Sequence, residues 1–255
     1  MKDQTGTLEQ IHYRVTGAGL NLLLVSGLNG QARFWDPVRT SLAKHYTVLT
    51  YDQRGCGNTP DDRADWSIET LASDAFALAD AVFGTAPFTV VGHSTGGAIA
   101  QQMAAAQPER ITAVGLSGTW MQADDYMRAL FALRQDLLTR APDLDPILSN
   151  ILRMPPADFG LPGQDVSLDV SVTSRRIDAL IGHQGALLAP RITAPALVVC
   201  ARDDRIVPPY LSMALHEALP QSTLHVVQDG GHFFVHSRVE LFVRGLLDWL
   251  GQIAE

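Results

Sequence analysis

The sequence has only two cysteines, Cys56 and Cys200, among its 255 residues. Two cysteines are too few for a disulfide framework, and neither has the spacing to other ligand residues that a metal site needs. The loop around Cys56 also supplies no base that would make its thiol a nucleophile. The sequence therefore predicts a protein of a reducing compartment, without a metal site.

Positive charge is scarce as well. Nineteen Lys and Arg residues stand against 27 Asp and Glu, the formal net charge is −8, and no basic run exceeds Arg175-Arg176. A nucleic-acid footprint or a polybasic membrane surface is therefore not expected. No apolar run approaches the roughly 20 residues that span a bilayer, and the segment 1–7 lacks the apolar core of a signal peptide. We expect a cytoplasmic protein whose partner is a small molecule.

What the chain does contain is an alternation of two periodicities. Short apolar runs typical of strands alternate with helix-like stretches, and this pattern occupies both ends of the chain. The strand-like runs are 11–15, 22–25, 48–51, 88–91, 111–116, 196–200 and 223–227, and the helix-like stretches are 38–44, 68–82, 212–219 and 239–253. Strands joined by crossover helices form a mostly parallel central sheet with helices on both faces, so the sequence predicts an α/β fold.

The stretch 120–191 interrupts the alternation. It has no convincing strand, and prolines break its helical pieces, among them Pro142, Pro146 and the pair Pro155-Pro156. Pro162-Gly163 is a further break. The amphipathic segment 126–138 favours an ordered helical insertion over a loop. We therefore expect a helical cap at 120–191 between two parts of one core, residues 1–119 and 192–255.

A Gly-x-Ser-x-Gly segment, Gly92-His93-Ser94-Thr95-Gly96, lies between an apolar strand-like run and an alanine-rich helix-like one. A sharp strand-to-helix turn would strain Ser94 and expose its hydroxyl, and the flanking glycines let neighbouring backbones approach. The alternative is a turn whose serine merely caps the helix. In this context the pattern predicts a nucleophilic serine at Ser94. His93 should point away from the cleft, because neighbours on a strand face opposite ways.

A serine hydroxyl needs a base within hydrogen-bond reach. Of the eight histidines, only His232 follows a strand-like run and a glycine pair, Gly230-Gly231. Loops at the carboxyl ends of strands are where α/β sheets place reacting groups, so His232 is the predicted base. The alternative is a loop histidine bonded to the backbone. His236, one helical turn further on, is expected to pack or to face solvent.

The acid that orients the base should also follow a strand. Asp203 and Asp204 both follow the run 196–200, and periodicity alone does not choose between them. Asp124 and Asp125, which follow the run ending near Ser117, are a second possibility.

These motifs together resemble the α/β-hydrolase family over nearly the full chain. The run 52–57, Asp-Gln-Arg-Gly-Cys-Gly, is similar to the family's Asp-x-Arg-Gly-x-Gly turn after the fourth strand, and Gly92–Gly96 is similar to its nucleophile elbow. The run 204–208 is similar to the family's Asp-x-x-Val-Pro signature, and Gly231-His232 to its Gly-His motif. The resemblance implies a Ser94, Asp204, His232 triad in the family's chain order, and so selects Asp204 over Asp203.

An oxyanion hole requires two backbone N–H groups directed to where negative charge develops. Thr95, which follows the predicted nucleophile, supplies one by its position. The resemblance implies Leu28 as the second donor, in the run Ser26-Gly27-Leu28-Asn29. Ser26 stands where the family usually has a histidine. Asn29 is either an additional side-chain donor or, next to Gly30, a turn residue.

Within the family, runs such as 26–30 and 200–204 are similar to aminoacrylate (carbamate) hydrolases of pyrimidine breakdown, and more distantly to 3-oxoadipate enol-lactonases. The resemblance implies a cofactor-free serine hydrolase that cleaves a small carboxylic ester, lactone or amide- or carbamate-like substrate through an acyl-enzyme. The alternatives are a carbon–carbon bond hydrolase or lyase on the same triad, and a small-molecule receptor of the same fold.

The cap region supplies candidates for substrate contacts. Four apolar residues are candidates to line a pocket under the cap, and plain packing is the alternative for each: Trp35, Trp120, Met121 and Phe131. Arg128 and Arg134 are candidates to meet a substrate carboxylate, with solvent-facing ion pairs to nearby aspartates as the alternative. The sequence leaves the choice between a monomer and a homodimer open.

Overall fold

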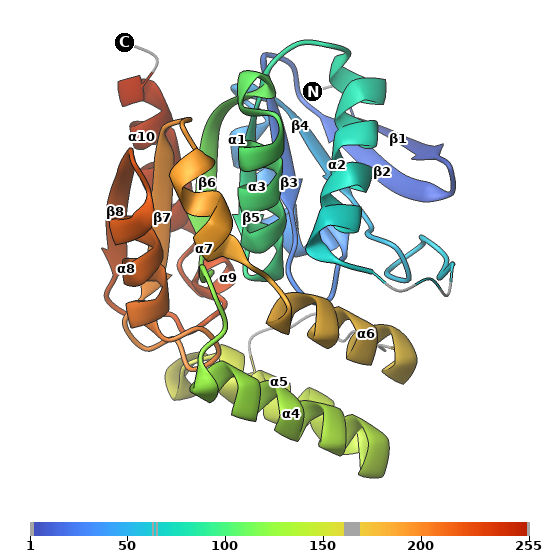
Figure 1. Ribbon diagram of the computed structural model, residues 1–255. Coiled ribbons are helices and arrows are strands. Elements are labelled where there is room, and N and C mark those ends of the chain that lie inside the picture. The colour runs from blue at the N-terminus through green and yellow to red at the C-terminus, as the bar shows by residue number, and fades with distance from the viewer. Residues whose placement is uncertain (1–2, 63, 65, 161–168, 254–255) are drawn as a thin grey trace.

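A single mostly parallel sheet forms the centre of the protein (Figure 1). The computed structural model describes residues 3–62, 64, 66–160 and 169–253. In spatial order the strands are β1 (Asp3–Leu8), β2 (Ile11–Thr16), β4 (Tyr46–Tyr51), β3 (Leu20–Val25), β5 (Phe88–His93), β6 (Ile111–Ser117), β7 (Ala196–Ala201) and β8 (Ser222–Val227). Neighbours from β4 to β8 pair in parallel, whereas β2 is antiparallel to both β1 and β4. The predicted α/β class is confirmed.

Helices cover both faces of the sheet because its central strands are apolar on both sides. On one face α2 (Ile68–Phe83), α3 (Thr95–Ala106) and α8 (Pro209–Ala218) pack against Val90 and its neighbours. On the other face α1 (Asp36–Leu42) and α10 (Val239–Ile253) pack against Val91. Successive strand residues point to opposite faces, so β5 contributes to both halves of the core.

The hairpin of β1 and β2 adds an edge strand that the sequence analysis did not predict. The β1 sequence, Asp-Gln-Thr-Gly-Thr-Leu, has one strongly apolar residue, and the strand lies mostly exposed at the edge of the sheet. An edge strand buries little side-chain surface and is stabilised by backbone hydrogen bonds to its neighbour, so its sequence carries no apolar run.

Three helices inserted between β6 and β7 lie across the carboxyl ends of the strands (Figure 1). They are α4 (Asp125–Arg140), α5 (Asp145–Arg153) and α6 (Val170–Ile181), and we call them the cap helices. Pro146 sits in the first turn of α5, where its missing N–H costs no helical hydrogen bond. Pro162 and Gly163 lie outside the described residues. The limits 120 and 191 of the cap stay a prediction, because α7 (Gly185–Leu188) packs against α3 of the core.

The remaining elements are short: the 3-10 turns η1 (Ala32–Trp35), η2 (Pro108–Arg110), η3 (Pro142–Leu144), η4 (Pro156–Asp158) and η5 (Ala189–Arg191), and the helix α9 (Phe234–Ser237). Within the described ranges, no helix is both long enough and apolar enough to cross a bilayer.

Candidate active site

Ser94 occupies the sharp turn between β5 and α3 in a strained backbone conformation. Its φ of 56° and ψ of −122° lie in a region that residues with a Cβ rarely adopt. A Cβ at Gly92 would lie 2.0 Å from the Gly96 carbonyl oxygen, and one at Gly96 would lie 2.0 Å from the Val25 carbonyl oxygen. Only glycine fits at these two positions, so the Gly-x-Ser-x-Gly spacing follows directly from the tight turn.

Hydrogen bonds from β6 and the following segment hold this turn in place. The Ser94 N–H donates to the Ser117 carbonyl at 2.8 Å, and the Thr119 hydroxyl donates to the Ser94 carbonyl at 2.9 Å. The Ser94 side chain makes no capping hydrogen bond to α3. The capping alternative raised by the sequence is therefore not what the structure shows, and the hydroxyl is left for another role.

His232 and Asp204 form a buried pair at the carboxyl ends of β8 and β7. The His232 Nδ1 lies 2.7 Å from the Asp204 Oδ2, and the two residues are 3% and 4% exposed. The other carboxylate oxygen, Oδ1, accepts from the N–H groups of Ile206 and Val207, both at 2.9 Å. With Nδ1 facing a carboxylate, we assign the ring proton to Nδ1, which leaves Nε2 unprotonated and able to accept a proton.

The neighbouring aspartate has a different contact set. Asp203 accepts from the backbone N–H groups of Gly230 and Gly231, at 3.2 and 2.9 Å, and so ties down the loop that carries His232. Asp124 caps α4 through the Met127 N–H and accepts a hydrogen bond from Tyr210. Asp125 is exposed. Of the four candidate acids, only Asp204 touches the His232 ring.

Ser94 and His232 both line one narrow cavity of about 60 Å³ beneath the cap helices. Leu28, Asn29 and Phe131 line it as well. A space of this size holds a small acyl group and little more. The cavity therefore brings together a strained serine and a carboxylate-oriented histidine, the two groups that nucleophilic acyl transfer requires.

The comparison with known proteins identifies the family. The model of the alpha/beta hydrolase family matches residues 22–244, most of the chain. The chain belongs to the alpha/beta hydrolase family. Its relatives in the family are named as hydrolases, so the chain is an enzyme of the hydrolase class, as the resemblance predicted.

Relatives within the alpha/beta hydrolase family narrow the comparison. The chain is 30% identical over 260 residues to a protein of Azorhizobium caulinodans named "Putative carbamate hydrolase RutD", with 95% of this chain and 96% of the relative covered. A protein of the same name from Escherichia coli O7:K1 is 32% identical, with 91% of each chain covered. An enol-lactonase from Burkholderia xenovorans superimposes with a TM-score of 0.84 at 22% identity, covering 97% of this chain and 100% of that one. The last likeness concerns the fold alone.

The run 26–29, which we call the oxyanion segment because it was predicted to supply an oxyanion donor, lies beside Ser94 in this alpha/beta hydrolase. A Cβ added at Gly27 would lie 3.0 Å from the Ser94 Cβ, so the backbone of 27–28 passes directly against Ser94. Within the part of the chain that the structure describes, neither the Leu28 nor the Thr95 N–H donates to another group. Ser26, which replaces the family's usual histidine, receives hydrogen bonds from the Gln53 amide at its carbonyl (2.7 Å) and its hydroxyl (3.5 Å).

Of the four apolar pocket candidates, the structure brings only Phe131 to the cavity. Trp35 is fully buried in the core between the sheet and α10, where it contacts Phe242. Trp120 belongs to the cluster that joins the cap helices to the core, and Met121 packs against the core on the α3 face. For these three, the structure shows the packing alternative.

The expectation that His93 points away from the cleft is wrong. Its ring lines the cavity, lies 4.8 Å from the His232 ring between centroids, and stacks on Phe34. The reason is that Phe233 and Phe234, in the segment that carries His232, cover this face of β5. Strand alternation sends His93 to the face opposite α3, and at the end of the strand that face belongs to the active site.

Two cap arginines have contacts that the sequence did not indicate. Arg134 is buried and forms a two-point ion pair with Asp145 at 3.0 Å, and it also lines the cavity. The alternative of an ion pair with an aspartate is therefore right for Arg134, but the pair is buried and does not face solvent. Arg128 is exposed. Arg153, which the sequence analysis did not single out, lines the cavity with its guanidinium over the Phe233 ring.

Cys56 is buried, and burial raises the pKa of its thiol, which agrees with its having no nucleophilic role.

The histidines next to the site make stability depend on pH. Burial lowers the pKa of His236 to about 4, although its Nε2 contacts the Phe34 carbonyl, and burial lowers the pKa of His93 well below its ordinary value. The unfolded chain then binds more protons than the folded one between pH 6.5 and 4. Each such histidine therefore lowers the free energy of unfolding by up to about 1.4 kcal/mol per unit of falling pH.

We expect His236→Gln to remove one such contribution. Urea unfolding at pH 7.0, 6.0 and 5.0 should give a shallower loss of unfolding free energy in this variant than in the parent. A variant at the exposed His45 controls for the loss of a histidine in general. Parallel curves for the parent and His236→Gln would contradict the expectation.

Proposed function

We propose that the protein is a serine hydrolase that cleaves a small carboxylic ester, lactone, or amide- or carbamate-like substrate through an acyl-enzyme. The observation that carries the proposal is the arrangement of three residues. Ser94 is strained and uncapped, His232 shares its cavity, and Asp204 holds the far edge of the His232 ring at 2.7 Å. We further propose a cytoplasmic site of action; the choice between a monomer and a homodimer stays open.

The reaction follows from the roles that this arrangement permits. The Ser94 Oγ attacks the substrate carbonyl carbon while the His232 Nε2 takes the hydroxyl proton. Asp204 stabilises the charged ring, and the N–H groups of Leu28 and Thr95 donate to the carbonyl oxygen as it becomes negative. His232 then gives its proton to the leaving group, and the bond from the carbonyl carbon to that group breaks. Water, deprotonated by His232, attacks the acyl-enzyme and releases the acid and free Ser94.

The small volume of the cavity supports a small substrate. Its volume of about 60 Å³ favours short acyl groups over long ones. Arg134 and Arg153 lie in the wall on the side of the cap. Arg134 is paired with Asp145, and Arg153 donates to the Asn150 side-chain oxygen at 3.2 Å and lies over the Phe233 ring. The name of the two relatives, "Putative carbamate hydrolase RutD", fits the proposed class of substrate.

Rapid mixing with p-nitrophenyl acetate and p-nitrophenyl butyrate tests the proposal. We expect a burst of nitrophenol close to one equivalent per chain, followed by slower turnover, because acylation and deacylation are separate steps. A fluorophosphonate probe should attach to Ser94, as mass spectrometry of the digested protein would show. A folded parent with neither a burst nor labelling at Ser94 would overturn the proposal.

A further inference from the structure

Arg176 reaches from cap helix α6 into the core and contacts the oxyanion segment. It is 1% exposed, and it donates to the Leu28 carbonyl through Nε at 2.6 Å and to the Gly27 carbonyl through Nη2 at 3.2 Å. The same Nη2 donates to the Gln53 side-chain oxygen at 2.5 Å. One cap side chain thus holds two consecutive carbonyl groups beside Ser94.

We propose that Arg176 is a positioning residue that orients the Leu28 N–H as an oxyanion donor; the proposal rests on the proposed function. The peptide bond is planar and trans, so the Gly27 carbonyl and the Leu28 N–H belong to one rigid unit and point in opposite directions. A guanidinium that holds the carbonyl oxygen therefore directs the N–H to the other side. The Gly30 N–H donates to the same carbonyl at 2.9 Å and reinforces that orientation.

The second contact fixes the neighbouring peptide unit. A peptide unit flips by opposite changes in the torsions on either side of it, which leaves its neighbours nearly in place. A flip of the 27–28 peptide would therefore break the hydrogen bonds of the Gly27 carbonyl to Arg176 and to the Gly30 N–H, while the bond from Arg176 to the Leu28 carbonyl holds the 28–29 unit. Preorganised donors matter for catalysis because they need no rearrangement when the oxyanion forms.

The charge of Arg176 argues against a purely stabilising role. Its three acceptors are all neutral oxygens, and its Nη1 is buried with no hydrogen-bond partner among the described residues. Burying a charge without a carboxylate partner is costly, and apolar packing would be a more stable filling for this position. A positive charge on the far side of the 27–28 peptide polarises that unit and strengthens its N–H as a donor.

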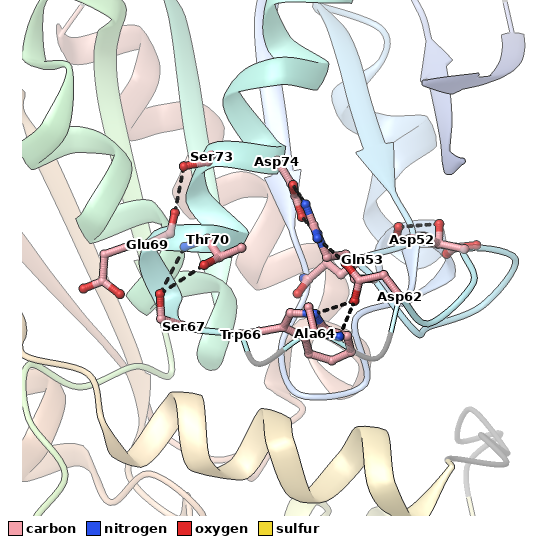
Figure 2. A network of polar contacts seen from close by, with 12 residues as sticks. Asp52, Gln53, Asp62, Ala64, Trp66, Ser67, Glu69, Thr70, Ser73 and Asp74 are labelled. Atoms are coloured by element: carbon pink, nitrogen blue, oxygen red, sulfur yellow. Dashed lines mark hydrogen bonds and ion pairs between the residues drawn. The ribbon is translucent and has the colours of Figure 1, made fainter. Parts of the chain in front are cut away.

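Gln53 extends the same network to the loop after β4. Its amide nitrogen donates to the Ser26 carbonyl, and its oxygen accepts from Arg176. The next residue, Arg54, pairs with Asp74 of α2 and with Asp62, which fixes the loop on the core. The Asp62 side chain also accepts from the Ala64 N–H and the Trp66 indole, each at 3.0 Å (Figure 2). Arg176 and Gln53 thus take over the support of a segment in which Ser26 replaces histidine.

Arg175 provides a matched control on the same helix. It donates to the Asp61 carboxylate at 2.6 Å and to the Ala64 carbonyl at 2.7 Å, and it lies over the Trp66 ring. It therefore anchors α6 to the same loop without touching Gly27, Leu28 or Gln53. Replacing Arg175 tests the anchoring of the cap, and replacing Arg176 tests the anchoring together with the oxyanion segment.

The experiment compares Arg176→Met, Arg176→Lys and Arg175→Met with the parent by burst and steady-state kinetics on p-nitrophenyl acetate. We expect Arg176→Met to lower kcat and the acylation rate by roughly 100-fold, as the loss of one oxyanion donor does, with KM changed less than threefold. Arg175→Met should keep kcat within about threefold of the parent value, even if its Tm falls by as much as the Tm of Arg176→Met. Arg176→Lys should fall in between, because a single ammonium cannot hold two carbonyls.

The outcomes separate the two proposals. A parent without Ser94-dependent turnover would overturn both. An active parent in which Arg176→Met and Arg175→Met lose kcat equally, or in which Arg176→Met changes KM alone, would overturn only the role of Arg176. If Arg176→Met does not fold, the folded Arg176→Lys variant decides: a kcat at least tenfold below the parent supports the proposal, and a parental kcat overturns it.

Discussion

Replacing Ser94 with alanine is expected to lower kcat/KM for the cleaved ester by roughly 10⁴- to 10⁶-fold, the size of effect that loss of a serine nucleophile has in hydrolases. Without the hydroxyl no acyl-enzyme forms, and only transition-state binding by the backbone donors remains. The backbone strain at φ 56° is the same for serine and alanine, so Tm should change little. Stopped-flow mixing with p-nitrophenyl acetate measures both the burst and the residual turnover.

Ser26→Ala is the matched control for this substitution. Ser26 is also buried and also lines the cavity, but its hydroxyl only receives a 3.5 Å contact from Gln53. We expect its turnover to stay within about fivefold of the parent, since a long hydrogen bond contributes little. A Ser94→Ala variant that retains the burst, or a Ser26→Ala variant that loses it, would show that another nucleophile performs the reaction.

Asp204→Asn is expected to lower kcat by roughly 10⁴-fold, the effect of the same change in a known triad. The reason lies in the hydrogen bonds of the carboxylate. Oδ1 accepts from the N–H groups of Ile206 and Val207, so the asparagine oxygen has to stay there and its NH₂ group has to face His232. That NH₂ group donates to Nδ1 and moves the ring proton to Nε2, where it blocks proton transfer from Ser94.

Asp203→Asn separates this effect from a general loss of charge. Its single remaining acceptor oxygen can keep the 2.9 Å bond to the Gly231 N–H and lose only the longer one to Gly230. We expect a fall in kcat of less than about tenfold, together with a lower Tm. The two variants differ by one sequence position. Equal losses of kcat, or a larger loss in Asp203→Asn, would therefore show that Asp204 does not have the orienting role.

The elbow and the orienting pair were predictable because each depends on local chemistry that leaves a mark in the sequence. The glycines at 92 and 96 have no room for a Cβ, and the strand-like runs place Asp204 and His232 at the same edge of a parallel sheet. The choice between Asp203 and Asp204 was different. It came from the resemblance, and only the observed contacts give its physical reason, since both side chains accept backbone N–H groups and one also meets the ring.

The wall of the cavity was not predictable in the same way. Trp35, Trp120 and Phe131 are all large and apolar, and nothing in their local sequence shows which one faces the cavity. Arg134 pairs with a residue eleven positions away, and Arg176 with residues more than 120 positions away. Contacts between distant segments depend on how the cap helices dock, and single-sequence patterns carry no record of that docking.

By itself, then, the sequence determined the α/β fold, the turn at Ser94 and the strand ends that carry Asp204 and His232. These features follow from periodicity and from backbone space, which act over a few residues. Only the tertiary structure decided that His93 lies in the site, that Arg134 is neutralised by Asp145 and that Arg176 holds the oxyanion segment. Each of these depends on which buried polar groups meet when separate segments pack, because a polar group taken out of water must find its partner wherever the fold supplies one.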